Sequence, residues 1–418
     1  MARTTGKKPS ANLTEIGGTG LRAFGGVIGE EFLRQLQGAK GLKIYREMSD
    51  NDPIIGSILF IIDKLLRNVT WKVNPTDDSP AAKEEADFVS SCMIDMEHSW
   101  EEFISELLSM LIYGFSLHEI VYKIREDGRV GIAKLPIRGQ ETIWRWNTDG
   151  CMRDFVSIDQ LLPTGGSFTI PADKLLLFRT QSYKNNFQGR SILRNAFRPW
   201  YFKKKLEEVE AIGAERDLNG FPVAYVPPNL LSANATDEEK ATLAAIKRMV
   251  TNVRIDEQMG MVYPLAYDEN NNQLYKFELM STSGTRQHDT NSIITRYSKT
   301  MAMTVAADFI FLGLDKVGSF ALSSDKTSTF SMAMGAWLKA IAAVLNRKLV
   351  PKLMTLNGVP KELYPQFVPG DIEKEDIATF VDAIYKLVGV GALQPDDDID
   401  AKARELLNLP IKISNGTM

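Results

Sequence analysis

The stretch GRSILRNAFRPWYFKKKLEEVEAIGAERDLNGFPVAYVPP, residues 189–228, predicts a long helix that leads directly into a strand. The helical pattern extends over 191–218, and Pro199 is expected to kink it or to start a second segment. Asn219 and Gly220 are expected to stop the helix, since glycine is common just past a helix end. The next residues, 221–228, have the apolar character of a strand and end in two prolines.

Downstream of this stretch, the sequence alternates a compact insert with long helices. The expected elements are a capped helix over 236–250, strands over 259–267 and 273–280, and long helices over 286–312 and 326–357. Thr236 and Glu239 have the spacing of a capping box. A glycine- and serine-rich segment, 313–325, separates the last two helices. The order helix, insert, helix, loop, helix therefore dominates this half of the chain.

The N-terminal half predicts helices followed by a small mixed sheet. Asp52 before Pro53 is a strong helix start, because an N-cap carboxylate precedes proline at the first helical position. Short strand-like runs separated by turn signals occupy 116–186. The glycine-rich first 34 residues are expected to form a flexible arm, and 371–412 a small helical pair. The fold class that these patterns indicate is α+β and mainly helical.

Composition limits the classes of protein. The chain has 418 residues, of which 44% are hydrophobic, with 53 acidic against 49 basic side chains. This balance argues against a surface that grips nucleic acid over its whole area, since such binding needs many Lys and Arg contacts to phosphate. The two cysteines are too few for a disulfide framework. The longest apolar run, 54–62, falls short of the roughly 20 residues of a membrane span, so we expect a core helix and no membrane partner.

Catalytic chemistry has no candidate in the sequence. The three histidines, His98, His118 and His288, have no metal-type partners at helical spacing and no Cys-x-x-Cys motif nearby. The acidic run 396–400 lacks the glycine that a calcium loop needs at its sixth position, where Ala401 stands. We therefore expect no catalytic residue, no metal and no cofactor, and the chain is not expected to be an enzyme.

Four stretches together identify a family. They are YREMSDNDPIIGSILFIIDKLLRNVTWKVNP (45–75), FISELLSMLIYGFSLHEIVYK (103–123), the stretch 189–228 quoted above, and 259–350. In this order and spacing the sequence resembles the portal proteins of tailed bacteriophages, in particular the Mu-like (DUF935-type) group. The resemblance covers roughly residues 35–355.

The resemblance implies an architecture for the whole chain. The implied regions are an arm (1–34), a wing (35–188), a first stem helix (189–220), a clip (221–282), a second stem helix (283–312), a tunnel loop (313–325), a tunnel helix (326–357), and a short crown with the C-terminal tail (358–418). Portals of this family form closed rings of commonly about twelve copies, with heterologous contacts between neighbours.

The resemblance also implies partners and a location. A portal ring occupies one capsid vertex of the virion, after assembly in the host cytoplasm, and double-stranded DNA passes through it. The large terminase subunit and later a head–tail connector dock at the clip, and the major capsid protein meets the wing. The clip residues expected to bind these partners are Tyr225, Pro227, Pro228, Asp237 and Lys240.

A channel for DNA should hold the duplex without binding it tightly. Each phosphate paired with Lys or Arg releases counterions and deepens the binding well, so a neutral or acidic wall with few basic positions is expected. A channel-lining stem helix fits the charge pattern of this region, in which Glu207 and Glu208 balance the charges of Lys203 and Lys204. An ordinary helix stabilised by charge pairs three and four residues apart explains the same pattern.

The segment 313–325 is expected to project into the channel and to touch the DNA backbone without sequence preference. The residues expected to do so are Lys316, Gly318, Ser319, Ser323, Ser324 and Lys326. A plain connector between two helices remains the alternative, since most such loops only connect. Phe330, Met334, Trp337 and Ile341 recur at helical spacing and predict core or subunit-interface positions.

Two other classes remain as alternatives. A nuclease or packaging ATPase would need a phosphate loop, a metal cluster or a catalytic histidine, none of which the sequence offers. Another ring-forming head–tail adaptor or baseplate protein is the closer alternative, although the order helix, insert, helix, loop, helix favours a portal. Trp144 and Trp146 fit either a partner surface or the core.

Overall fold

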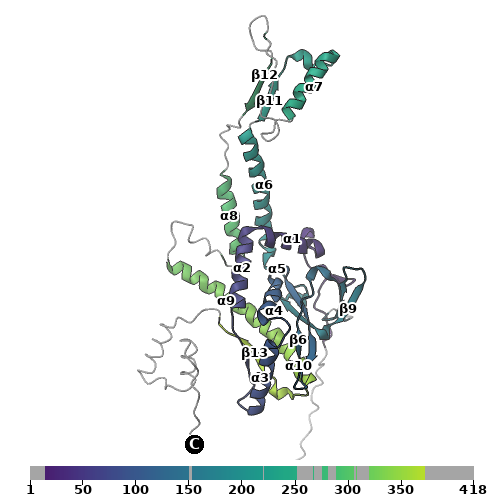
Figure 1. Cartoon of the computed structure of the whole chain (residues 1–418), viewed down its shortest axis with the longest axis vertical. Coiled ribbons are helices and arrows are strands. Elements are labelled where there is room, and N and C mark those ends of the chain that lie inside the picture. The colour runs from purple at the N-terminus through teal and green to yellow at the C-terminus, as the bar shows by residue number, and fades with distance from the viewer. Residues whose placement is uncertain are drawn as a thin grey trace, which may run out of the picture. The chain divides into compact units, whose positions relative to one another are not determined.

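The computed structural model describes residues 15–149, 153–219, 221–251, 267, 275–280, 289–305, 307 and 320–371. The chain divides into two compact units (Figure 1). Unit 1 combines Met1–Ala196 with Ala302–Met418, and unit 2 is the intervening Phe197–Met301. Both helices and antiparallel strands are present, which confirms the α+β class.

Unit 1 begins its helical layer with α1 (Gly38–Asn51) and α2 (Pro53–Arg67). The predicted start of α2 is confirmed: one carboxylate oxygen of Asp52 accepts hydrogen bonds from the N–H groups of Ile54 and Ile55, at 3.0 and 3.1 Å. These bonds satisfy donors that a helix start leaves unpaired. The apolar stripe of α2 lies in the core through Ile55, Ile58, Ile62 and Leu66.

Three more helices follow, each with a recognisable start or end. They are α3 (Pro80–Ile94), α4 (Trp100–Leu107) and α5 (Ser109–Tyr113). Ser99 and Glu102 form a capping box at the start of α4. Gly114 ends α5 in the left-handed conformation, with φ of 95°, which glycine adopts without steric cost.

Gly114 and Gly189 approach each other so closely that neither position has room for a side chain. A Cβ on Gly114 would lie 2.6 Å from the carbonyl oxygen of Gln188, and a Cβ on Gly189 would lie 2.2 Å from the carbonyl oxygen of Gly114. Thr180 N–H also donates to that Gly114 oxygen, at 3.1 Å. This contact joins two of the stretches that carry the family resemblance, 103–123 and 189–228.

Short antiparallel ladders cover the helices of unit 1. The pairs are β4 (Phe115–Glu119) with β10 (Leu175–Arg179), β5 (Val121–Ile124) with β6 (Val130–Lys134), β3 (Trp71–Asn74) with β13 (Gln366–Pro369), and the sheet β7 (Ile143–Thr148), β8 (Phe155–Leu161), β9 (Ser167–Pro171). Within the described residues, 3-10 turns lie at Arg34–Leu36, Gln140–Thr142, Ala172–Lys174, Tyr183–Asn185, Ile192–Arg194, Pro228–Leu231 and Lys361–Leu363.

The expectation of a flexible arm over 1–34 is wrong for its described part. Residues 23–28 form a hairpin, β1 (Ala23–Phe24) with β2 (Val27–Ile28). Leu21 and Ile28 are buried in a small second core with Trp146 and Ile158. Their burial outweighs the flexibility that the glycines of this stretch suggested. Residues 1–14 lie outside the described part of the chain.

A long helical segment crosses the main core of unit 1 (Figure 1). It consists of α9 (Phe320–Val344), a π-helical turn (Leu345–Leu349) and α10 (Val350–Leu356). The helix therefore starts before the predicted residue 326, and Pro351 continues it because proline fits the first turn of α10. By length and composition Thr329–Leu356 could cross a membrane, but Phe330, Met334 and Ile341 are buried in the core and Trp337 packs against it, which matches the core alternative predicted for this spacing.

Two asparagines fasten this helical segment to strands. The Asn346 side chain donates to Phe367 O at 3.0 Å and accepts from Phe367 N at 2.8 Å. Asn357 makes the same reciprocal pair with Val130, at 2.9 and 2.8 Å. Since Phe367 belongs to β13, residues 366–369 pack with unit 1 and do not begin the separate crown expected over 358–418. Residues 372–418 lie outside the described part of the chain.

Unit 2 is built on two helices and a two-stranded ladder. Its elements are α6 (Phe197–Asn219), β11 (Phe221–Tyr225), α7 (Asp237–Thr251), β12 (Lys276–Met280) and α8 (Thr290–Met303). Pro199 lies in the first turn of α6, where its missing N–H costs nothing. It therefore marks the start of a second helical segment after the turn at Ile192–Arg194, which was one of the two predicted outcomes, and does not kink a continuous helix. The helix predicted over 286–312 is shorter, because α8 ends at Met303. The strand predicted over 259–267 lies mostly outside the described residues.

Candidate functional site

The helices α6 and α8 of unit 2 lie side by side and antiparallel (Figure 1). The rings of Phe202 and Tyr297 stack with centroids 6.4 Å apart and planes 22° from parallel. Two turns further along α6, the Glu210 carboxylate accepts a hydrogen bond from the Thr290 hydroxyl. These two contacts fix which face of each helix points toward the other. We call this helix pair the stalk.

The ladder between β11 and β12 continues the same antiparallel arrangement. Phe221 pairs with Met280, and Tyr225 pairs with Lys276. The Asn219 end of α6 therefore leads into one strand, while the other strand precedes α8 in the sequence. Residues 226–275 between the two strands include α7, which packs against β11 and the turn at Pro228–Leu231. Unit 2 is thus a helical stalk that carries a small αβ insert.

The four residues expected on the channel stem have different surroundings. Lys203 is only 3% exposed, and its Nζ lies 3.7 Å from Oε1 of Glu207. The Nζ of Lys204 lies 5.6 Å from the centre of the Trp200 ring. Glu208 pairs with Lys205 at 2.7 Å, and the hydrogen bond from Lys205 lowers the pKa of Glu208. The structure therefore brings Lys203 and Glu207 together, and it adds Lys205, which the predicted set of four omitted.

Apolar side chains of α6 reach the surface of unit 2. Val209 is 64% exposed and Ile212 is 49% exposed. They lie three residues apart, so they share one flank of the helix. Val209, seven residues from Phe202, lies about 20° from it around the helix. Ile212 lies about 80° from Phe202, on the opposite flank from Glu210, which contacts α8. This flank was not predicted from the sequence, because the positions of apolar residues along a helix do not show whether the core of the same chain covers them.

The residues expected to bind partners at the clip lie around the ladder and the start of α7. Tyr225 is the last residue of β11 and is half exposed, with Lys276 Nζ 5.9 Å from its ring centre. Pro227 and Pro228 open the turn that follows. Asp237 begins α7 and pairs with Lys240 at 3.5 Å. The predicted capping box is confirmed by reciprocal hydrogen bonds between Thr236 and Glu239.

The residues expected in the tunnel loop divide into two groups. Lys316, Gly318 and Ser319 lie outside the described residues. Ser323, Ser324 and Lys326 lie within α9, whose first residue is Phe320. The predicted end of the loop at 325 is therefore too late. Serine was read as a sign of a loop, but serine is only a moderately poor helix former, and an apolar neighbourhood can override its preference.

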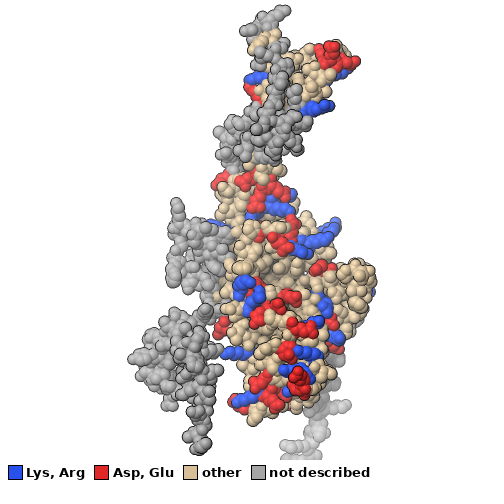
Figure 2. Space-filling view, in the orientation of Figure 1, with Lys and Arg blue, Asp and Glu red and all other residues tan. Residues whose placement is uncertain are grey.

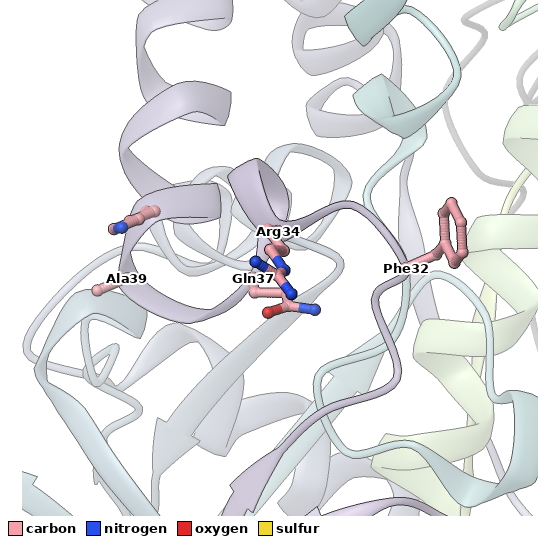
Figure 3. Close-up of a pocket in the computed structure, with 5 residues that line it drawn as sticks. Phe32, Arg34, Gln37 and Ala39 are labelled. Carbon is pink, nitrogen blue, oxygen red and sulfur yellow. The ribbon is translucent and has the colours of Figure 1, made fainter.

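Unit 1 has two neighbouring cavities beside the N-terminal hairpin. The smaller, of about 500 Å³, is lined by Phe32, Arg34, Gln37, Ala39 and Lys40. Figure 3 shows Arg34 and Gln37 close together near the start of α1, with Phe32 apart on the preceding segment. The larger, of about 700 Å³, has Phe32, Trp144 and Tyr183 among its lining residues. Trp144 is 62% exposed, whereas Trp146 is buried in the second core.

Ion pairs hold the N-terminal segment against the rest of unit 1. The carboxylate of Glu31 accepts two hydrogen bonds from the Arg194 guanidinium, at 2.7 and 2.8 Å. Burial alone would raise the pKa of Glu31, but the bonds from Arg194 and from Leu33 N–H outweigh burial and lower that pKa. Glu30 pairs with Lys184 at 3.3 Å. These charges serve to fix the segment in place.

His118 has a structural environment. It is fully buried in β4, where Nδ1 lies 2.8 Å from Leu135 O and Nε2 lies 2.8 Å from the Ser116 hydroxyl. Nδ1 can only donate to a carbonyl, so the Ser116 hydroxyl donates to Nε2 of a neutral ring. Burial lowers the pKa of His118 to about 4. Rings of Phe103 and Phe178 pack on its sides, so no substrate can reach it.

Within the described residues, no group of three or more His, Cys, Asp or Glu side chains is placed to hold a metal ion. Basic and acidic side chains intermix over the face of the described surface that Figure 2 shows. Cys92 is buried, and burial raises the pKa of its thiol.

Solved structures with the same fold come from gene transfer agent (GTA) particles. A chain of the neck of an empty GTA particle, computed with C6 symmetry, is 13% identical with a TM-score of 0.55, covering 91% of this chain and 95% of that chain. A chain of the virion of a native GTA particle is 11% identical with a TM-score of 0.54, again covering 91% of this chain and 95% of that chain. A chain of the neck of a native GTA particle, computed with C12 symmetry, is 12% identical with a TM-score of 0.52, covering 88% of this chain and 94% of that chain.

The family model for the portal protein of Mu bacteriophage matches residues 42–406. That range includes both units and all four stretches on which the resemblance was based. It also extends beyond residue 355, where the resemblance read from the sequence ended. The chain therefore belongs to the Mu-type family of bacteriophage portal proteins.

Proposed function

We propose that this portal-family protein closes into a ring around a DNA channel at one capsid vertex, and that it acts without a catalytic site of its own. The observation that carries the proposal is the antiparallel stalk of α6 and α8 with an insert at its far end. Stalks placed side by side around an axis would make a tube, with the inserts at one end. Family membership and the fold shared with GTA neck chains support this arrangement.

The regions of the proposed ring follow the two units. Unit 1 would supply the wing and the tunnel helix, α6 and α8 the stem, and residues 221–280 the clip. Heterologous contacts between neighbouring copies close such a ring. A copy number of about twelve is the usual value for the family, and one GTA neck of similar fold was computed with C12 symmetry. The segment before α9 would reach toward the DNA at the narrowest part of the tunnel.

The partners of the proposed ring meet it at different ends. The insert would receive the large terminase subunit during packaging and a head–tail connector afterwards, through the surface around Tyr225 and the start of α7. The wing would meet the major capsid protein. ATP would be consumed by the terminase. The protein would assemble in the host cytoplasm and remain in the virion.

Electron microscopy of the purified full-length chain tests the proposal. The expected result is a ring with an axial hole wide enough for a duplex, and antibody or gold labels on unit 1 and on residues 226–275 at opposite ends. Labelled particles should carry a single ring at one vertex. A protein that stays monomeric in solution and in particles, or that lies away from the path of the genome, would contradict it. A ring found only in the tail would favour an adaptor or baseplate role.

A further inference from the structure

The outer faces of the two stalk helices differ in chemistry. On α8, Thr290 and Tyr297 point toward α6. Residues two positions from these lie about 160° away around a helix of 3.6 residues per turn. The three residues two positions from them are Ser292, Thr295 and Lys299. Ser292 and Thr295 are exposed, and exposed Arg296 flanks them. This face, which we call the hydroxyl face, carries short polar groups and two cations.

No acidic residue interrupts the hydroxyl face. Between Thr290 and Met303 the sequence of α8 is TNSIITRYSKTMAM, without a single Asp or Glu. The Arg296 guanidinium lies 5.2 Å from the centre of its neighbour Tyr297's ring. Short hydroxyl groups donate readily to phosphate oxygens, and the two cations attract the phosphate backbone as a whole. With two cations per copy and no acidic residue on α8, such a wall is more basic than the neutral or acidic wall expected from the sequence, and the inference replaces that expectation.

The outer surface of α6 has the opposite character. Its Glu207 and Glu208 side chains are about half exposed and repel phosphate, although they have lysine partners on the same helix. Val209 and Ile212 add an exposed apolar flank, and exposed apolar groups of this kind mark contacts with other proteins. A surface with both properties suits packing against a neighbouring stalk better than facing DNA.

We propose that α8 forms the DNA-facing wall of the stem through Ser292, Thr295, Arg296 and Lys299, while the Val209–Ile212 flank of α6 packs against the next copy. The inference rests on the proposed ring and assigns opposite tasks to its two stem helices. It departs from the sequence-based expectation that α6, through Lys203, Lys204, Glu207 and Glu208, lines the channel. The partner of α8 is the phosphate backbone of a duplex, contacted without reading its sequence.

Site-specific photocrosslinking in DNA-filled particles tests this assignment. Benzoylphenylalanine would be placed singly at Thr295 and at Ser292 on α8, and at Glu208 and Ile212 on α6, in the full-length chain. We expect DNA adducts from positions 295 and 292 and none above background from 208. Position 212 should give a dimer of the chain.

The outcomes separate the inference from the proposed function. DNA adducts from 208 alone, or from both helices alike, would overturn the assignment of the wall to α8 and leave the channel intact. DNA adducts from neither helix would overturn the stem as the conduit. A dimer formed through 295 in place of 212 would reverse the two tasks.

A matched pair of charge variants gives a second measurement. Arg296→Gln with Lys299→Gln removes the two cations of α8, and Lys204→Gln with Lys205→Gln removes two cations of α6. Purified rings of each variant would be bound to duplex DNA over a range of salt concentrations. The slope of log affinity against log salt becomes shallower by about 0.9 for each phosphate that the protein no longer neutralises, so the α8 pair should flatten the slope and the α6 pair should not. Equal slopes would contradict the inference.

Discussion

Unit 1 and the stalk differ in how they cover their apolar side chains. In unit 1, α9 lies across a core that also takes in α2, α4 and several strands, and Phe103, Leu107 and Met334 are almost fully buried. In the stalk, a pair of helices leaves Val209 and Ile212 at the surface. A two-helix pair cannot enclose both flanks of its helices. Unit 1 therefore encloses a core within one chain, although Phe24, Phe32 and Ile94 at its surface are more exposed than Val209. The stalk has only its helix pair to cover apolar side chains, so we expect neighbouring copies to cover the rest.

This difference predicts that equivalent substitutions have unequal effects on the isolated chain, from several kcal/mol in unit 1 to almost nothing on the stalk flank. The largest effect is expected for Gly114→Ala. The new methyl group would meet Gln188 O at 2.6 Å and two backbone nitrogens at 2.9 Å, at a φ of 95°. Strain and crowding together should cost about 3–5 kcal/mol. Urea unfolding of the full chain, followed by tryptophan fluorescence, measures it.

Gly128→Ala is the matched control for this substitution. Gly128 has a φ of 80°, but a Cβ there would have no atom within 4 Å. This control should therefore show only the strain of the left-handed backbone, about 1 kcal/mol. A Gly114→Ala protein no less stable than Gly128→Ala would show that the Gly114–Gly189 contact relaxes without cost, and unit 1 would be less tightly packed than its geometry indicates.

The second largest effect concerns pH. The folded-state pKa of His118 is about 4, below its ordinary 6.5, because burial disfavours the charged ring. The contribution of the neutral His118 ring to the free energy of unfolding is fully present above about pH 6.5. It is lost as the pH falls toward 4, because only the unfolded chain takes up the proton readily. At about 1.4 kcal/mol per pH unit, the loss reaches about 3 kcal/mol.

His118→Gln isolates this effect. Glutamine can still donate and accept a hydrogen bond but does not titrate. Between pH 7 and pH 4, the free energy of unfolding of the variant should therefore fall by about 3 kcal/mol less than that of the wild type. Carboxylates with lowered pKa values, such as Glu31, lose stability over the same range in both proteins and cancel in the difference. Parallel pH profiles for the two proteins would show that the buried histidine does not control the acid sensitivity of unit 1.

Much of this contrast could be read from the sequence, and part of it could not. The Asp52 cap and the Thr236–Glu239 box depend on neighbouring residues, and the structure confirms both. The pairing of β13 with β3 joins segments nearly 300 residues apart, and no local sequence pattern predicts it. The partners of Asn346 and Asn357 could not be predicted either, because they are backbone groups of strands elsewhere in the sequence, at Phe367 and Val130.

The candidate site shows the same limit. The sequence identified the family and predicted two long helices on either side of an insert, but it placed the candidate channel residues on α6 by charge pattern alone. Only the contacts of Phe202 with Tyr297 and of Glu210 with Thr290 reveal which faces of the stalk remain outside. The hydroxyl face of α8 has no motif, because serine and threonine on a helix are ordinary until their neighbours are known. Helix bounds near 303 and 320 were missed for a similar reason, since local composition alone does not decide where a helix starts or ends.

A smaller effect, of opposite sign, is expected for Gly213→Ala in α6. A Cβ at this position would have no atom within 4 Å, apart from the helix's own backbone. Alanine in a helix interior is favoured over glycine by about 0.5–1 kcal/mol, so the isolated chain should become slightly more stable in the same urea assay. If ring formation weakened at the same time, a neighbouring copy would approach α6 at this glycine. A loss of stability in the isolated chain would contradict the open surroundings of the stalk.

The smallest effect on the isolated chain, and the sharpest test of the contrast, is expected for Val209→Ser combined with Ile212→Ser. Both side chains are largely exposed, so the free energy of unfolding of the dilute chain should change by less than about 0.5 kcal/mol. Ring formation, measured by analytical ultracentrifugation, should nevertheless be abolished or shifted to much higher protein concentration. Ala211→Ser, at another exposed position of α6, is the control and should assemble normally. A double variant that unfolds easily would mean that the stalk covers this flank by itself. One that folds and assembles as well as the control would place the contact between copies elsewhere, and the stalk would then need no neighbour on this flank.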